Sequence, residues 1–239
     1  METSAPTQAT ADRYAHVASP IHMIVVLAAL SGWAYSGKIF TDQLSVAVHP
    51  NRVRLYLLTI FVEWLVFVLV VAGVRRSGAS VFLVIGDRWR SIRQLLRDVG
   101  IAAGFWIIAV TLLWLFSKLL RISDMARNMQ FMLPHGGVEI GLWIALSITA
   151  GICEETIFRG YLQRQFIGLT KNVPAGILLS AAAFGAAHAY QGFRHVILIA
   201  LFGAMFGILA YRRGTVRPGM IVHAWQDTLG GLVGALLKH

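Results

Sequence analysis

Three short clusters of polar residues in the C-terminal half of the chain have the residue types and the spacing for hydrolytic chemistry. The first is the run EETIFR at residues 154–159, the second ends at His188, and the third joins His223 to Asp227. A carboxylate and an imidazole that share a site can activate a water molecule by general base catalysis. From residue 140 onward, every Asp and Glu of the sequence belongs to one of these clusters. This concentration indicates a site rather than a random scatter of charge.

The first cluster gives its two carboxylates different surroundings. Side chains four residues apart share a face of a helix, so Glu155 is expected to pair with Arg159 in the favourable order, Glu before Arg. Glu154 lies about 100° further round the helix and has no fixed cation. That position suits a general base. A plain salt bridge at a helix end, on the membrane surface, is the alternative for the same run.

The other two clusters place histidines on apolar helices. His188 follows a run of small residues at 180–187, and small residues let helices pack closely in membranes. His188 is therefore expected to point into a helix bundle, where a hydrogen bond to a neighbouring helix would be its simplest role. His223 and Asp227 share one face near the start of the last apolar segment. There, Asp227 could do no more than orient its histidine.

A distance argument links the first two clusters. If residues 138–169 and 173–190 form a helical hairpin that turns near residue 171, Glu154 and His188 both lie roughly 22 Å from the turn. The hairpin therefore predicts that the carboxylate and the imidazole meet inside the membrane. The same arithmetic places His223 roughly 10–15 Å from the level of Glu154 and His188 along the bundle. Either the segment around 189–195 is irregular and deep, or the last two helices are displaced.

Composition indicates a membrane protein. The 239 residues are 57% apolar and only 13% charged, with a mean hydropathy of +0.67. A typical soluble domain is about half apolar and about a quarter charged. These values exclude a disordered chain, a coiled coil and most soluble enzymes, and they predict an all-α, polytopic transmembrane helical bundle. About seven segments are apolar and long enough to span, with an eighth left open: 20–37, 55–74, 99–117, 138–158, 173–189, 195–211 and 218–237.

These segments suggest two units and an orientation. Residues 1–137 would form an N-terminal transmembrane region of about three spans with a basic loop at 75–98, and residues 138–239 a catalytic core of about four spans. Thirteen Lys and Arg fall on one side of the seven spans and eight on the other, which predicts a cytoplasmic N-terminus in the cell (inner) membrane. Because the basic residues lie in short loops, the net charge of +10 is not taken as a nucleic-acid footprint.

The basic loop at 75–98 has two interpretations. It could hold a short amphipathic helix on the membrane surface, with Trp89, Ile92, Leu95 and Leu96 on its apolar side, or it could be a plain connection. His22 and His195 lie at the ends of spans and are expected to face water.

The three motifs resemble those of the CPBP family, which includes the type II CAAX prenyl endopeptidases and the bacteriocin-processing or abortive-infection proteins. The resemblance covers about residues 138–237 and implies an intramembrane endopeptidase that cleaves a membrane-associated or lipid-modified (CAAX-type) substrate near its terminus. It implies that Glu154 and His188 activate a water molecule and that His223 and Asp227 stabilise the oxyanion. Arg159 would be structural or would hold a substrate carboxylate, with Glu155 and Phe184 as supporting residues.

One position departs from the family pattern. The prenyl endopeptidases typically have Asn where this sequence has Asp227, and Asn can donate a hydrogen bond to an oxyanion while an ionised Asp cannot. Asp227 could be protonated, could orient His223 as the donor, or could help to bind a metal. The departure weakens the CAAX substrate more than it weakens the resemblance.

Metal dependence stays open in the sequence. Glu154, His188 and His223 could ligate zinc as an open catalytic site, and the family is commonly described as metalloproteases. The zincin spacing, with two histidines four residues apart and a Glu between them, is absent, and a Glu–His pair is sufficient to activate water.

Cys153 is expected to pack, because a thiol in an apolar helix resists ionisation. Glu63, in the middle of the second span, is a functional candidate without a partner in the sequence.

Two functions other than proteolysis are compatible with the same residues. The protein could be a catalytically silent membrane scaffold or a bacteriocin-immunity-type protein of the same fold. It could also be a small transporter that uses Glu154 and His188 as a proton relay.

Overall fold

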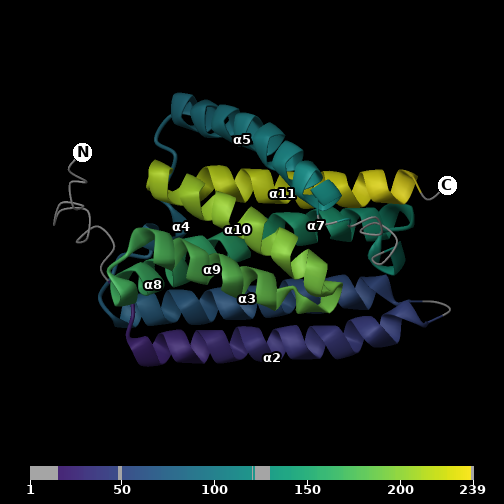
Figure 1. Ribbon diagram of the computed structural model, residues 1–239, viewed down its shortest axis with the longest axis horizontal. Coiled ribbons are helices and arrows are strands. Elements are labelled where there is room, and N and C mark those ends of the chain that lie inside the picture. The colour runs from purple at the N-terminus through teal and green to yellow at the C-terminus, as the bar shows by residue number, and fades with distance from the viewer. Residues whose placement is uncertain (1–15, 48–49, 120, 122–129, 238–239) are drawn as a thin grey trace.

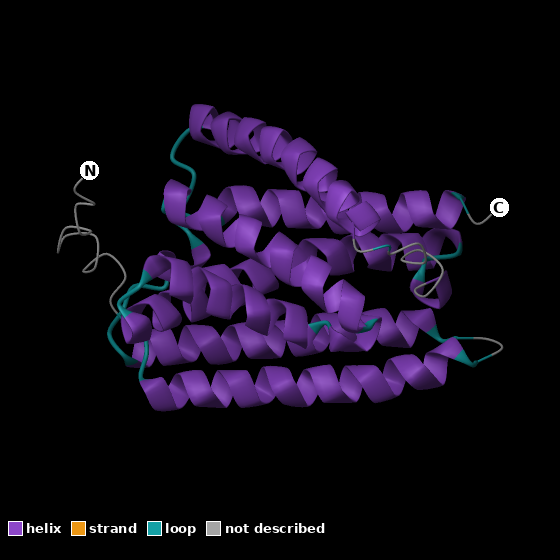
Figure 2. Cartoon of the chain, in the orientation of Figure 1, coloured by secondary structure: helices purple, strands orange, loops and turns teal. Residues whose placement is uncertain are grey.

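The computed structural model describes residues 16–47, 50–119, 121 and 130–237, and over these residues the chain is helices and loops without a strand (Figure 2). The predicted all-α class is confirmed. The helices, in chain order, are α2 (Pro20–Ser45), α3 (Arg52–Arg76), α4 (Phe82–Ile85), α5 (Ile92–Leu119), the 3₁₀ turn η1 (Gln130–Met132), α7 (Gly136–Glu154), the π-helix η2 (Glu155–Leu162), α8 (Gln163–Thr170), α9 (Val173–Ala187), the 3₁₀ turn η3 (Ala189–Gln191), α10 (Phe193–Arg213) and α11 (Arg217–Leu236).

Local signals in the sequence explain where several helices begin. The Ser19 side chain accepts a hydrogen bond from the backbone N–H of His22, and proline occupies the first turn of α2. The Asn172 side chain caps α9 in the same way through the N–H of Ala175. Lys171, with a φ of 52°, ends α8 just before this cap. The hairpin between α8 and α9 therefore turns near residue 171, as predicted from the sequence.

The bundle has the dimensions and surface of a membrane protein. Five helical stretches of the described chain are long and apolar enough to cross a membrane: α2, α3, α5, the continuous run Gly136–Thr170 and α10. The other two predicted spans are also helices, but α9 has only 15 residues and α11 is not among the candidate spans. Large apolar side chains such as Ile21, Phe61 and Leu119 are more than 60% exposed. Apolar exposure on this scale fits contact with lipid.

The helices are arranged so that the C-terminal unit lies between the N-terminal helices (Figure 1). α2 and α3 run side by side along one edge, and α5 lies along the opposite edge against α11. α3 packs on α7, α11 packs along α7, and α9 packs on α8 and α10. A Cβ added at Gly151 would lie 2.7 Å from the Met220 carbonyl oxygen. This close approach of α11 to α7 is possible because position 151 has no side chain.

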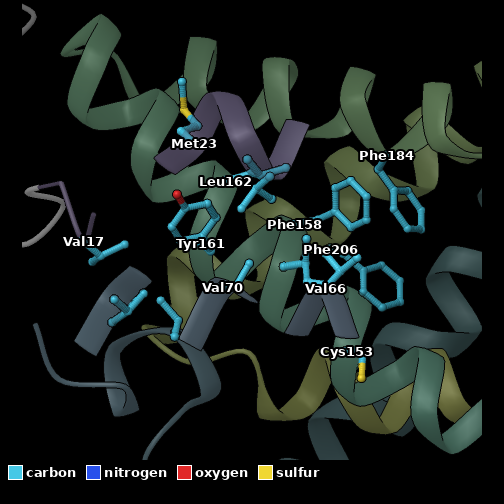
Figure 3. Close-up of a cluster of buried hydrophobic side chains, with 14 of the residues drawn as sticks. Val17, Met23, Val66, Val70, Cys153, Phe158, Tyr161, Leu162, Phe184 and Phe206 are labelled. Carbon is cyan, nitrogen blue, oxygen red and sulfur yellow. The ribbon is translucent and has the colours of Figure 1, made fainter. Parts of the chain in front are cut away.

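The main core surrounds the π-helix. Phe158, Tyr161 and Leu162 of η2 are fully or almost fully buried among side chains from α3, α9 and α10 (Figure 3). All eight residues of η2 are buried. Cys153 is a free, completely buried thiol in the same core, so the expectation that it packs is confirmed. The core therefore centres on the segment that follows Glu154 directly.

Two expectations for the basic loop and the span ends need correction. The third long helix begins at Ile92 rather than near 99, because Ser91 caps it through the N–H of Gln94, so Leu95 and Leu96 belong to the span. Within the loop between α3 and this helix, the only helical segment of the described chain is α4. His22 does not face water: its Nδ1 lies 2.7 Å from the Tyr161 hydroxyl, and its Nε2 lies 3.1 Å from the Leu69 carbonyl.

His195, the second histidine expected to face water, is 6% exposed. His195 is therefore buried, whereas His22 is half-buried, with both ring nitrogens in contact with other helices. The division of the chain at residue 137 stays a prediction.

The contact between η2 and α4 gives a stability prediction. A Cβ at Gly160 would meet the backbone carbonyl of Val84, so Gly160→Ala should push α4 away and lower the free energy of unfolding by about 1–3 kcal/mol. The measurement is thermal unfolding of the purified protein in detergent. Gly141→Ala is the matched control, because nothing lies within 4 Å of a Cβ at this helical position. Equal unfolding temperatures for the two variants would contradict the packing described here.

Candidate active site

The three polar clusters meet at one cavity of about 460 Å³ inside the bundle. Glu154, His188, His223 and Asp227 all line it, together with Phe184. They come from the end of α7, the end of α9 and the first half of α11. The structure thus brings together every residue that the sequence singled out for a direct role in water activation or oxyanion binding.

Glu154 and His188 face each other, as the hairpin arithmetic predicts. Glu154 Oε1 lies 3.9 Å from His188 Nε2. His188 caps the C-terminus of α9, and its Nδ1–H donates to the Phe184 carbonyl at 2.9 Å. Because a carbonyl can only accept, this bond fixes the proton on Nδ1 and leaves Nε2 directed at the carboxylate.

His223 approaches Glu154 from the other side. Its Nδ1 lies 3.0 Å from Glu155 Oε1, and its Nε2 lies 3.6 Å from both Glu154 Oε2 and Asp227 Oδ2. Both imidazoles therefore direct Nε2 at the same carboxylate, one at each oxygen. Asp227 is the most open of these groups, with 38% of its side chain exposed, whereas only 5% of the His223 side chain is exposed.

Beneath the cavity lies a buried ion pair. Arg159 Nη1 donates to Glu155 Oε1 at 2.8 Å, and the side chains are 1% and 0% exposed. The predicted pairing of Glu155 with Arg159 is confirmed. The Arg159 guanidinium lies 4.1 Å from the centroid of the Phe184 ring and 5.3 Å from that of Phe206, which hold it in a cation–π sandwich.

The hydrogen bond between Glu155 and His223 was not predicted. The two residues are 68 positions apart, and no local pattern in the sequence connects them. In the structure, one oxygen of Glu155 accepts from both Arg159 and His223. The supporting carboxylate thereby sets the ring orientation of His223, which is the role that the sequence analysis considered for Asp227.

The change from α-helix to π-helix separates the two adjacent carboxylates. Glu154 is the last residue of α7, and 15% of its side chain is exposed toward the cavity, whereas Glu155 begins η2 and is fully buried. Single wide turns of this kind recur at functional sites in proteins, where they redirect side chains. Here the change coincides with one carboxylate that faces the cavity and one that faces the protein.

The position of His223 answers the question that the hairpin arithmetic left open. The chain between α9 and α10 is irregular, with the 3₁₀ turn η3 and a φ of 97° at Gly192. α11 is also displaced, since it lies along α7 and makes few contacts with α10. The Trp143 indole N–H on α7 donates to the Asp227 carbonyl at 2.9 Å, which fixes this register.

The cavity continues beyond the polar cluster toward the N-terminal helices. Apolar side chains of α2, α3 and α7 line this part: Trp33, Phe40, Leu55, Leu58, Trp143 and Leu146. Glu63 of α3 lines the same cavity; it is 9% exposed, and its Oε2 has no hydrogen-bond partner in the described part of the chain. The mid-span carboxylate that had no partner in the sequence therefore shares the cavity with Glu154 and Asp227.

The structure does not assign a metal site to these residues. In the described chain, no group of three His, Cys, Asp or Glu side chains is placed to hold one. The two Nε2 atoms lie 3.9 and 3.6 Å from different oxygens of Glu154, and no ion-binding geometry is inferred from these distances. We therefore derive no step through a metal.

One comparison with known proteins matches the same segment. Residues 136–229 match the family model described as type II CAAX prenyl endopeptidase Rce1-like. No curated protein and no solved structure matches the chain. The matched segment begins with α7 and ends within α11, so it contains all the polar residues of the cavity named above except Glu63.

The buried ion pair gives a second stability prediction. Arg159→Leu should lower the free energy of unfolding by about 3–5 kcal/mol, because it leaves a buried carboxylate without its cation. The double variant Glu155→Gln/Arg159→Leu should lose less, since no uncompensated charge remains. Thermal or denaturant unfolding in detergent measures both.

Lys38→Ala is the control for this pair. The Lys38–Asp42 bridge has the same i, i+4 spacing but is more than half exposed, so its loss should cost about 1 kcal/mol or less. An Arg159→Leu variant as stable as Lys38→Ala would show that the buried pair contributes nothing.

Proposed function

Because residues 136–229 match the family model of the type II CAAX prenyl endopeptidases, Rce1-like, we propose that the protein is an intramembrane endopeptidase. Its substrate would be a membrane-associated or lipid-modified protein, of the CAAX type, cut near its terminus. One observation carries the proposal beyond the family match. The half-buried imidazole of His188 and the buried imidazole of His223 direct Nε2 at the two oxygens of a single cavity carboxylate, Glu154.

The distances around Glu154 suit a bound water molecule. Separations of 3.6–3.9 Å are too long for direct hydrogen bonds, and a water on the cavity side can contact the carboxylate and an imidazole together. In our proposal Glu154 is the general base, and His188 Nε2 accepts a second hydrogen bond from the same water. The fixed Nδ1–H of His188 makes that acceptor role available.

The reaction then follows as ordinary amide hydrolysis. Glu154 takes a proton from the water, and the water oxygen bonds to the carbonyl carbon of the scissile peptide. The resulting oxyanion receives a hydrogen bond from protonated His223 Nε2, whose ring is held by Glu155. Glu154 returns the proton to the nitrogen as the C–N bond breaks, which gives a new carboxyl terminus and a free amine.

The shape and chemistry of the cavity support a lipid-modified substrate. Its lining beyond the polar cluster is aromatic and aliphatic and is supplied by α2, α3 and α7. An apolar modification would be stabilised there by roughly 25 cal/mol for each Å² of surface it buries. The peptide bond next to such a group would then lie toward Glu154.

The five apolar spans make this an integral membrane protein. We propose that it resides in the cell (inner) membrane with its N-terminus in the cytoplasm. Support comes from the arginines of the basic loop and of the α10–α11 connection, which lie at the same end of the bundle as the start of α2 (Figure 1).

Glu154→Gln tests the proteolytic function. The purified protein in detergent or liposomes should cleave a fluorogenic farnesylated CaaX peptide, and Glu154→Gln should reduce kcat at least 100-fold, because an amide cannot accept the proton. Cleavage should persist in the presence of a chelator. Asp42→Asn, an exposed carboxylate outside the cavity, is the control and should cleave at the wild-type rate.

Equal cleavage by Glu154→Gln and wild type would overturn the mechanism. No cleavage by the folded wild-type protein would overturn the CAAX substrate and favour the silent scaffold. The peptidase proposal would then require cleavage of a different membrane protein substrate.

Substitution of Asp227 distinguishes its possible roles. Asp227→Asn should retain or increase activity, because Asn can donate to the oxyanion as in the prenyl endopeptidases. Asp227→Leu should lose activity at least tenfold by removing the polar partner of His223. Peptide cleavage at several pH values measures both variants. A Leu variant as active as the wild type, or an Asn variant as inactive as Leu, would exclude oxyanion binding by this residue.

A further inference from the structure

A second pocket, separate from the cavity, lies where the basic loop, α8 and the α10–α11 connection meet. Its volume is about 370 Å³, and it shares no residue with the candidate active site. Four arginines line it: Arg97, Arg164, Arg213 and Arg217. We propose that this pocket binds the phosphate headgroup of an anionic phospholipid.

A buried carboxylate organises the arginines. Asp98 is 0% exposed, and the side chains of Arg217, Arg97 and Arg213 lie 3.1, 3.9 and 3.9 Å from its oxygens. The Trp89 indole N–H also donates to Asp98, at 2.9 Å. One carboxylate cannot neutralise three guanidinium groups, so Asp98 fixes their positions and leaves a surplus of positive charge.

The geometry holds Arg217 in place before any ligand arrives. Arg217 is 9% exposed, lies over the Trp89 ring at 5.3 Å and donates from Nη1 to the Asp87 carbonyl at 2.8 Å. The Nε of Arg213 is buried and has no hydrogen-bond partner among the described residues. Asp87 is the only carboxylate among the described lining residues. Guanidinium groups match the oxygens of a phosphate, and the Nε of Arg213 is a donor available for one.

The position of the pocket favours a lipid over a free phosphate. It lies at the end of the bundle where α2 and α11 begin and where α3 and α10 end (Figure 1). In our proposal, the spans leave the membrane at this end. Basic pockets between spans at this level bind anionic headgroups. The side chains of Phe82 and Leu83 also line the pocket and are 44% and 46% exposed, so they are available to an acyl chain.

The site joins the two parts of the chain. Arg97 belongs to the N-terminal spans, whereas Arg164, Arg213 and Arg217 belong to the segment that carries the polar clusters. A bound headgroup would therefore bridge α5 to α8 and to the α10–α11 connection. Its expected effect is to stabilise the folded bundle, independently of whether the cavity cleaves peptides.

The test is lipid binding by the full-length purified protein. Wild type is titrated with phosphatidylglycerol and, separately, with phosphatidylcholine in the same detergent, and the unfolding temperature and lipid adducts are recorded by thermal scanning and native mass spectrometry. Phosphatidylglycerol should bind at least tenfold more tightly and raise the unfolding temperature more. Arg164→Gln/Arg213→Gln should weaken phosphatidylglycerol binding at least tenfold.

Two further variants make the result specific to the pocket. Arg212→Gln removes the same charge next to Arg213 but does not line the pocket, so it should bind phosphatidylglycerol as the wild type does. If the double variant does not fold, Arg97→Gln replaces it, because 58% of that side chain is exposed and its removal is tolerable. An equal loss of affinity in Arg212→Gln would mean that general surface charge, not the pocket, binds the lipid and would overturn the proposal.

The third arm uses inorganic phosphate in neutral detergent. A shift of unfolding temperature as large as that with phosphatidylglycerol would show a site for the free anion and overturn the lipid assignment. Unchanged phosphatidylglycerol affinity in the pocket variants would overturn the site itself.

Discussion

The site depends on one buried interaction, in which a single oxygen of Glu155 accepts hydrogen bonds from Arg159 and from His223. Desolvating an ion pair is costly, and such a pair is maintained only where its geometry is good and its remaining groups are satisfied. Here aromatic rings hold the guanidinium, and the close packing of α11 on α7 holds the imidazole. Because Glu155 neutralises the arginine and orients His223, the neighbouring Glu154 is left free to face the cavity.

Two features of the backbone make that arrangement possible. The change to a π-helix after Glu154 accompanies the separation of two consecutive carboxylates into different environments. Small residues at helix contacts, Gly151 of α7 against α11 and Gly185 of α9 against α10, let these two pairs of helices approach closely. In a bilayer, where apolar helices gain little by leaving lipid, such close van der Waals packing carries much of the association energy.

The N-terminal helices contribute residues to both the cavity and the basic pocket. They supply part of the apolar wall of the cavity and also Glu63, which lies outside the segment matched by the family model. They also supply Asp98 and Arg97 at the basic end of the bundle, where arginines from both parts of the chain converge. The same polypeptide therefore has an apolar cavity with carboxylates at its centre and a cationic pocket at one end, each formed by both parts.

The sequence by itself determined the helical membrane class, the seven helical segments, the pairing of Glu155 with Arg159 and the meeting of Glu154 with His188. These follow from local rules: apolar length, a period of 3.6 residues and a fixed rise along a regular hairpin. Only the tertiary structure decided that His223 bonds Glu155, that Glu63 shares the cavity, that His195 is buried and His22 half-buried, and that the third span begins at Ile92. Those outcomes depend on which helices lie side by side and in what register, and that choice is set by packing summed over many contacts that no local pattern records.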